Sequence, residues 1–99
     1  MNLIFLLGAE LDIQSAYTRH ESFQAGRGLV FMRCLDAGLT LLRTQPHIRR
    51  PYAGPYRRLL VSRFPYGVFY EAHSERLVIA AVMDLRQSPK AIKRRLLGD

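Results

Sequence analysis

The sequence is poor in cysteine and in long apolar runs, and each shortage excludes a class of protein. Its single cysteine, Cys34, cannot form an internal disulfide and lies among apolar neighbours in a helical pattern. We therefore expect a small buried side chain in a protein of a reducing cytosol. The apolar run LIFLL, residues 3–7, is too short for a membrane span, and no basic segment precedes it as in a secretory signal. These features indicate a bacterial cytoplasmic protein.

Patterns typical of metal sites and phosphate loops are also missing. No two of the histidines His20, His47 and His73 have the spacing of metal ligands, and no carboxylate cluster supports them. The glycines of GRG, residues 26–28, lie between two predicted helices, whereas a phosphate-binding loop follows a strand. We therefore expect neither a metal ion nor a cofactor.

The chain has few acidic residues for its many arginines. Its formal net charge is +7, and thirteen of its fifteen positive side chains are arginine. Between Arg43 and Arg63 there are six arginines and no acid. Such a protein attracts anions, and the arginine fork binds carboxylate and phosphate with two hydrogen bonds. A binding surface explains this bias, although a genome rich in arginine codons would produce it too.

The length of 99 residues predicts one domain, residues 1–99, with a thin core. In residues 9–25 apolar side chains recur every three or four positions, which predicts an amphipathic helix. Its inner stripe is Ile13, Ala16, Tyr17, His20 and Phe23. Residues 29–45 predict a second helix, which Pro46 ends and which buries Phe31, Leu35, Leu39 and Leu42. Because a short glycine turn joins them, the two helices are expected to form an antiparallel hairpin, and the mid-helix Gly38 indicates close contact between them.

Strand patterns occupy residues 3–7, 57–64, 66–72 and 77–85. A proline-rich loop, residues 46–56, precedes the last three strands, and HSE at 73–75 is short enough for a hairpin turn. Ser88 and Pro89 then begin a short basic helix that Gly98 ends. The predicted fold is α+β: an antiparallel sheet of the N-terminal strand and a C-terminal three-stranded meander, packed on the N-terminal two-helix hairpin, with a short C-terminal helix.

Side chains alternate across a strand, so odd and even positions divide the meander into two faces. The face expected against the helical hairpin carries Leu59, Val61, Tyr66, Val68, Tyr70, Val78, Ala80 and Val82. The second face carries Arg58, Leu60, Ser62, Phe64, Phe69, Leu77, Ile79, Ala81, Met83 and Leu85. A sheet with one solvent-exposed face would carry polar side chains on that face, but the second face of this sheet is apolar. Two covers are open: the last helix, through Ile92 and Leu96, or a partner chain, which the basic rim predicts to be acidic.

A family resemblance covers nearly the whole chain, in the segments YTRHESFQAG, LLRTQP, RRLLVSRFPYGVFYE, RLVIAAV and LRQSP. With these segments the chain resembles the RelE/ParE superfamily of bacterial toxin-antitoxin toxins, closer to the ParE-like branch. It implies a small toxin that is neutralised by a cognate antitoxin, which usually wraps an extended and often acidic segment around it. ParE-like members poison DNA gyrase, and RelE-like members cleave messenger RNA in the ribosome. DNA is expected to be bound through the antitoxin only.

The RelE-type catalytic positions can be compared residue by residue with this sequence. Aligned on the tyrosine of FPYGVFY, the basic and tyrosine positions of the nuclease fall on Arg58, Leu60, Gly67, Leu85 and Ala91, of which only Arg58 is basic. Cleavage of RNA requires positive charge around the scissile phosphate and a group that handles a proton. Should the chain be a nuclease, the substitutes would be Arg58, Arg63, Glu71, His73 and Arg86.

The leading hypothesis is a ParE-like toxin that acts by binding, without a catalytic site. Its antitoxin contacts are predicted at Leu60, Phe69, Ile79 and Met83, with Arg57, Arg58, Arg63 and Arg86 providing charge. The C-terminal KAIKRRLL is either a further contact or a solvated basic helix. The alternatives are a ribosome-dependent mRNA endonuclease with a rearranged site and a plain nucleic-acid-binding module, for which no motif is present.

Overall fold

The computed structural model describes residues 1–98, which form one five-stranded sheet and three helices. In chain order the elements are β1 (Asn2–Phe5), α1 (Leu7–Phe23), α2 (Arg27–Thr44), β2 (Pro51–Ala53), β3 (Tyr56–Leu60), β4 (Tyr66–Ala72), β5 (Arg76–Asp84) and α3 (Pro89–Leu97). The strands lie in the order β1-β5-β4-β3-β2, and all pairs are antiparallel except β1 with β5. The predicted α+β architecture is confirmed. The short edge strand β2, in the proline-rich loop, and the parallel pairing of β1 were not predicted.

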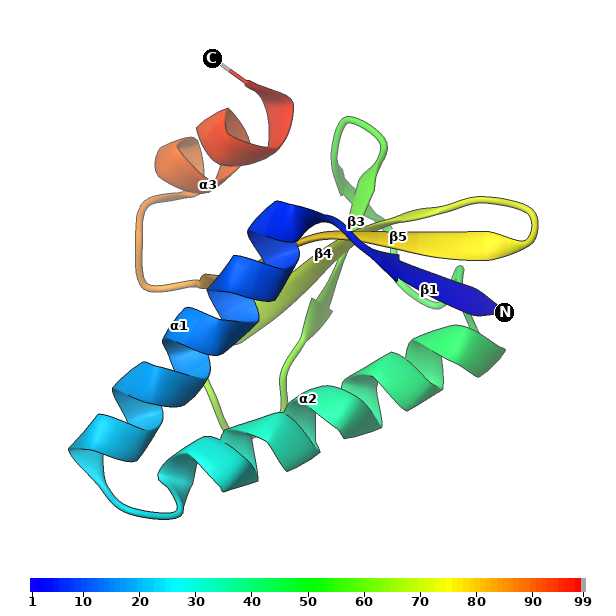
Figure 1. Cartoon of the computed structure of the whole chain (residues 1–99). Helices are drawn as coiled ribbons and strands as arrows, with labels where there is room; N and C mark the ends of the chain where they lie inside the picture. The colour runs from blue at the N-terminus through cyan, green and yellow to red at the C-terminus, as the bar shows by residue number, and fades with distance from the viewer. Residues whose placement is uncertain (99) are drawn as a thin grey trace.

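The helices α1 and α2 form the predicted hairpin and pack on one face of the sheet (Figure 1). Gly26, in the left-handed conformation at φ 90°, turns the chain between them. The carboxylate of Glu21 accepts hydrogen bonds from the backbone N–H groups of Gly26 and Gly28 at 3.0 to 3.1 Å. It thereby satisfies free donors at the start of α2, which has no side-chain cap from its own N-cap residue.

Two glycines allow the close packing of this layer. A Cβ atom on Gly28 would lie 2.9 Å from the backbone oxygen of Tyr17, so Gly28 is where the two helices approach each other. A Cβ atom on Gly38 would lie 2.8 Å from a methyl group of Leu59, so Gly38 makes room for strand β3. The prediction that Gly38 marks contact between the helices is therefore wrong. Two residues predicted on the inner stripe of α1 are exposed instead: Phe23, at the last turn of the helix, is 77 % exposed and Tyr17 is 39 % exposed.

A β-bulge changes which residues of β5 face the helices. Phe69 pairs with Ala81, but the next residue, Tyr70, pairs with Ile79, so the register shifts by one residue at this point. Alternation then places Leu77 and Ile79 in the core beneath the hairpin and turns Val78 and Ala80 to the opposite side. The predicted faces are thus reversed for these four residues. Phe64, predicted on the second face, also lies in the hairpin core, because β3 already ends at Leu60.

Helix α3 covers the second face of the sheet, on the side opposite α2 in Figure 1. Ile92 and Leu96 are buried there in a second core cluster with Ala53, Phe69, Ala81 and Met83. Ser88 caps the helix by accepting from the N–H of Ala91, and Gly98 ends it in the left-handed conformation. Burying Ile92 and Leu96 stabilises the docked helix by roughly 1.5 to 3 kcal/mol each. Of the two predicted covers, the last helix is the one that the structure shows.

Candidate functional site

Four of the five positions that the resemblance assigns to a RelE-type nuclease site lie together in the structure. Leu60 pairs with Gly67 across β3 and β4. A Cβ atom on Gly67 would lie 3.1 Å from Leu85 and 3.3 Å from Arg58. The guanidinium of Arg58 lies 4.6 Å above the ring of Tyr52. Leu60, Gly67 and Leu85 carry no charge, so Arg58 is the one residue of this cluster that could pair with a phosphate.

The substitute nuclease residues do not form one site. A nitrogen of His73 lies 3.4 Å from the carboxylate of Glu71, and both residues are at the end of β4 that joins β5. Arg63 and Arg86 lie beyond the other end of β4, since Tyr66 at that end pairs with Asp84. At about 3.3 Å per residue, the length of the strand separates the two groups by on the order of 20 Å. A single phosphate cannot contact both.

The apolar residues predicted to bind an antitoxin have different environments. Leu60 is 58 % exposed. Phe69 and Met83 lie beneath α3, and Ile79 is fully buried in the core on the opposite side of the sheet. In this structure α3 covers Phe69 and Met83, which is one of the two covers that the sequence left open; their contact with an antitoxin stays a prediction. The placement of Ile79 on the second face is wrong because of the bulge in β5.

The predicted arginine contacts are spread around the sheet. Arg57 donates to the backbone oxygen of Arg49, and its neighbour Arg58 stacks on Tyr52. Arg63 lies in the loop after β3 with a positive φ of 70°, which is uncommon for a residue other than glycine. Arg86 follows β5 and binds Asp84. The four therefore give a basic margin and not one continuous patch.

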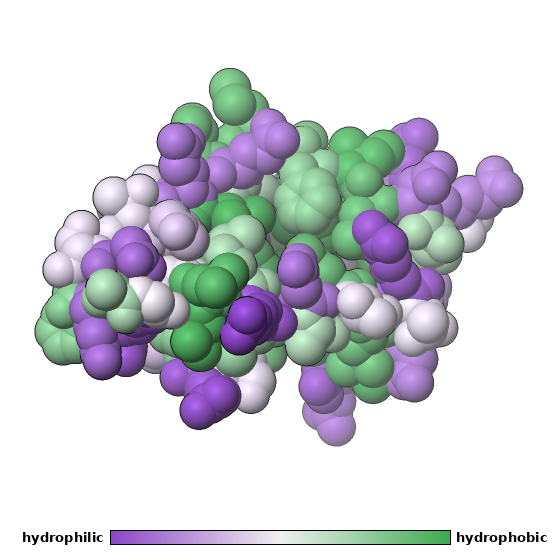
Figure 2. Space-filling view, turned by 60° about the horizontal axis from the view of Figure 1, so that its bottom comes forward, coloured by the Kyte–Doolittle hydropathy of each residue, from purple (hydrophilic) through white to green (hydrophobic). Residues whose placement is uncertain are grey.

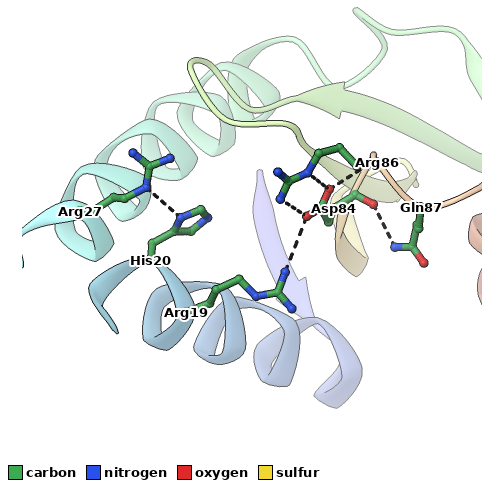
Figure 3. A network of polar contacts seen from close by, with 6 residues as sticks. All are labelled: Arg19, His20, Arg27, Asp84, Arg86 and Gln87. Carbon is green, nitrogen blue, oxygen red and sulfur yellow. Dashed lines mark hydrogen bonds and ion pairs between the residues drawn. The ribbon is translucent and has the colours of Figure 1, made fainter. Parts of the chain in front are cut away.

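A polar network joins the end of α1 to the segment after β5 (Figure 3). Arg86 donates to both carboxylate oxygens of Asp84, at 3.0 and 2.7 Å, and Arg19 lies 3.7 Å from the same carboxylate. Gln87 donates to the backbone oxygen of Asp84. The hydrogen bonds from Arg86 hold the pKa of the Asp84 carboxyl below its ordinary value, although partial burial opposes them.

His20 and Arg27 form a separate pair beside the Asp84 group (Figure 3). The side chain of His20 is 6 % exposed and packs against the rings of Phe31, Phe64 and Tyr66. Arg27 donates through Nε to His20 Nδ1 at 3.1 Å. Burial, and next the charge of Arg27, lower the pKa of His20. Sequence reasoning placed His20 on the inner stripe, which is confirmed, but missed its pairing with Arg27, because that contact crosses the turn between the helices.

The surface also carries apolar side chains outside these sites. Figure 2 shows apolar groups separated by hydrophilic side chains over the face that it presents. Large exposed apolar residues include Leu7, Leu11, Phe23, Leu29, Leu60 and Leu97. Within residues 1–98 no cluster of three or more His, Cys, Asp or Glu side chains could hold a metal ion. No helix in the same range is both long and apolar enough to cross a membrane.

Comparison with known proteins gives a likeness of fold. No protein-family model matches the chain, and no curated protein matches its sequence. Among solved structures, the fold is similar to that of a chain of the chromosomal ParDE TA system from P. aeruginosa, with a TM-score of 0.76 and 16 % identity. The match covers 86 % of this chain and 96 % of the other. The chain therefore has the fold expected from its resemblance to the RelE/ParE superfamily, shared with a protein of a ParDE system.

Proposed function

We propose that this protein is the toxin of a type II toxin-antitoxin module, that it acts in the cytoplasm, and that a cognate acidic antitoxin neutralises it. The observation that carries the proposal is the likeness of nearly the whole fold to a chain of a ParDE system. A net charge of +7 supports the acidic character of the partner, because opposite charges speed association and select the partner.

The proposed action is binding of the target, DNA gyrase, and not cleavage of RNA. The apolar cluster of Leu60, Gly67 and Leu85 supports this choice, since it occupies the place of the charges that a RelE-type nuclease needs. The separation of His73 from Arg86 along β4 supports it as well. A ribosome-dependent mRNA endonuclease is the alternative that the experiment below would detect.

The antitoxin is proposed to contact the exposed Leu60 and the basic margin. Leu60 is the accessible member of the predicted apolar set, and Arg58 lies two residues before it on the same face of β3. Arg57, Arg63 and Arg86 extend the positive charge to both sides. An acidic segment with an apolar side chain would satisfy both features.

Induction of the chain alone in bacteria tests the function. We expect growth arrest with filamentation and DNA damage while translation continues, and inhibition of supercoiling by purified gyrase. Leu35→Asp, which places a charge in the hairpin core, is the control that should abolish every effect. Immediate arrest of translation, with codon-dependent cuts in messenger RNA on ribosomes, would establish the nuclease instead. Unaffected growth would contradict the toxin proposal.

A further inference from the structure

A small pocket opens beside the hairpin end of the molecule, next to the network of Figure 3. Its volume is about 200 Å³. We call it the arginine pocket, and its walls are Arg19, His20, Phe23, Arg27, Pro65 and Arg86. These residues come from the end of α1, the start of α2 and the loops that flank β4 and β5. Arg58, Leu60, Gly67 and Leu85 do not line this pocket.

Arg27 is held at this pocket by two aromatic rings and one hydrogen bond. Its guanidinium carbon lies 5.4 Å from the centre of the Phe23 ring and 5.2 Å from that of Phe64. Its Nε donates to His20, whereas its two terminal nitrogens have no hydrogen-bond partner within residues 1–98. A guanidinium that is already fixed loses little freedom when it binds an anion, and its planar fork matches a carboxylate.

The pocket carries excess positive charge and an unused donor. The walls include three arginines and no acidic residue. The nearby carboxylate of Asp84 pairs with Arg86 and more distantly with Arg19, and no contact joins it to Arg27 within residues 1–98. Because Arg27 can only donate, His20 Nδ1 must accept, and the proton of the neutral ring is on Nε2. His20 Nε2 is buried and has no partner within the described residues. In Figure 3 this edge of the ring turns away from Arg27, towards the side on which Asp84 and Arg86 lie.

The size and walls of the pocket limit what it can receive. About 200 Å³ is below the roughly 300 to 1,000 Å³ of sites that enclose a whole small molecule, so one side chain is the better fit. At the rim, Phe23 is 77 % exposed and Pro65 is exposed too. These apolar groups suit the neighbours of an acidic residue in a peptide. A nucleic-acid backbone would offer phosphates but no aliphatic neighbours.

We propose that the arginine pocket binds a carboxylate side chain from an acidic, partly apolar segment of a partner protein. The carboxylate pairs with the free nitrogens of Arg27 and with Arg86 or Arg19, and an apolar neighbour packs on Phe23. The inference goes beyond the proposed function, because it places a protein contact on the helical-hairpin side of the sheet, apart from Leu60. The partner is a protein that carries such an acidic and partly apolar segment.

NMR titration of the whole protein tests the proposal, with the side-chain signals of Arg27 Nε and of the His20 ring as reporters. The probe is the peptide acetyl-Glu-Leu-Glu-Phe-Glu-amide, compared with its glutamine counterpart, inorganic phosphate and a ten-nucleotide oligothymidine. We expect saturable shifts with the acidic peptide, and weakening of about tenfold in Arg27→Gln, since a charged pair is lost. Arg33→Gln, which removes the same charge from an exposed site on α2, should change binding less than about twofold.

Several results would overturn the inference. They are equal binding of the glutamine peptide, tighter binding of the oligothymidine through the same signals, and equal losses in Arg27→Gln and Arg33→Gln. If Arg27→Gln does not fold, Arg19→Gln replaces it, because that side chain is 66 % exposed. Peptide binding is measured without any growth assay, so its failure would leave the proposed toxin activity standing.

Discussion

The carboxylate of Asp12 binds the guanidinium of Arg95 through two hydrogen bonds, at 2.8 and 2.6 Å. The same carboxylate accepts from the backbone N–H of Val82 at 2.9 Å. Strand β1 ends before it reaches this part of β5, since its last pair is Phe5 with Ile79. Asp12 therefore accepts from a backbone N–H on the edge of β5 that faces away from β4, where no strand within residues 1–98 pairs with it, and it connects α1, β5 and α3.

Asp12→Ala is predicted to destabilise the protein by about 2 to 3 kcal/mol. It leaves the N–H of Val82 without an acceptor and breaks the ion pair with Arg95, which contributes the smaller part because Arg95 is partly exposed. Urea denaturation measures the change. Asp36→Ala, at an exposed site on α2, should stay within about 0.5 kcal/mol of the parent protein. An equal loss in both variants would show that Asp12 has no special role.

The stability of the protein is predicted to fall with pH below neutrality because of His20. Burial, then Arg27, Arg19 and Arg86, lower the pKa of His20 in the folded state, and Asp84 opposes them weakly. The unfolded chain therefore binds more protons once the pH falls below about 6.5, the ordinary value for histidine. The contribution of the buried, neutral His20 to the free energy of unfolding is therefore complete above that pH. It is lost as the pH falls towards the pKa that His20 has in the folded state.

Urea denaturation at pH 7.5 and 5.5 measures this effect. His20→Phe, which keeps an aromatic ring among Phe31, Phe64 and Tyr66, should flatten the dependence. His47→Gln, on an exposed loop, should keep it. A parent protein that is equally stable at both values of pH would contradict the assignment.

Alanine is predicted to cost more at Gly28 than at Gly38. The Cβ atom at Gly28 meets the backbone oxygen of Tyr17, which cannot move without separating the helices, so we expect a loss of about 2 to 3 kcal/mol. At Gly38 it meets a methyl group of Leu59, and better helix propensity offsets about 1 kcal/mol of the strain. Leu59→Ala should relieve the strain of Gly38→Ala in a double-mutant cycle and leave that of Gly28→Ala unchanged. The reverse order of costs would contradict the packing described above.

Leu60→Ser is predicted to weaken antitoxin binding while it leaves folding intact. Because Leu60 is 58 % exposed, the free energy of unfolding should change by less than about 0.5 kcal/mol. If this residue is buried by the antitoxin, affinity should fall about tenfold, measured by calorimetry with the purified antitoxin. Leu29→Ser, on α2 and 50 % exposed, is the matched control and should bind normally. Equal affinities for the two variants would remove Leu60 from the interface.

Several elements of this fold could be predicted because their signals are local. Ser88 and Pro89 begin α3, Gly98 ends it, and Pro46 follows α2. The stripe of Phe31, Leu35, Leu39 and Leu42 is buried as its spacing indicates. Of the predicted second face, Phe69, Ala81 and Met83 do lie together on that side of the sheet. Which of its two possible covers occurs depends on contacts between segments far apart in the chain, such as Arg95 with Asp12, that no local pattern contains.

The candidate site was less predictable for the same reason. Arg86 was predicted as a contact residue because of its charge. Its position beside Asp84, Arg19 and His20 depends on how β5 and α1 pack against each other. Arg27 was not predicted as a site residue, because its contact with His20 crosses the turn between the helices and leaves no local pattern in the sequence.

The sequence by itself determined the helical hairpin, the three main strands and the strong positive charge, because periodicity, capping residues and composition act over a few neighbouring residues. Only the tertiary structure decided the faces of β5, the cover over Phe69 and Met83, and the gathering of arginines around His20. A bulge of one residue reverses the side to which every preceding side chain of the strand points, and only the pairing between strands fixes its position.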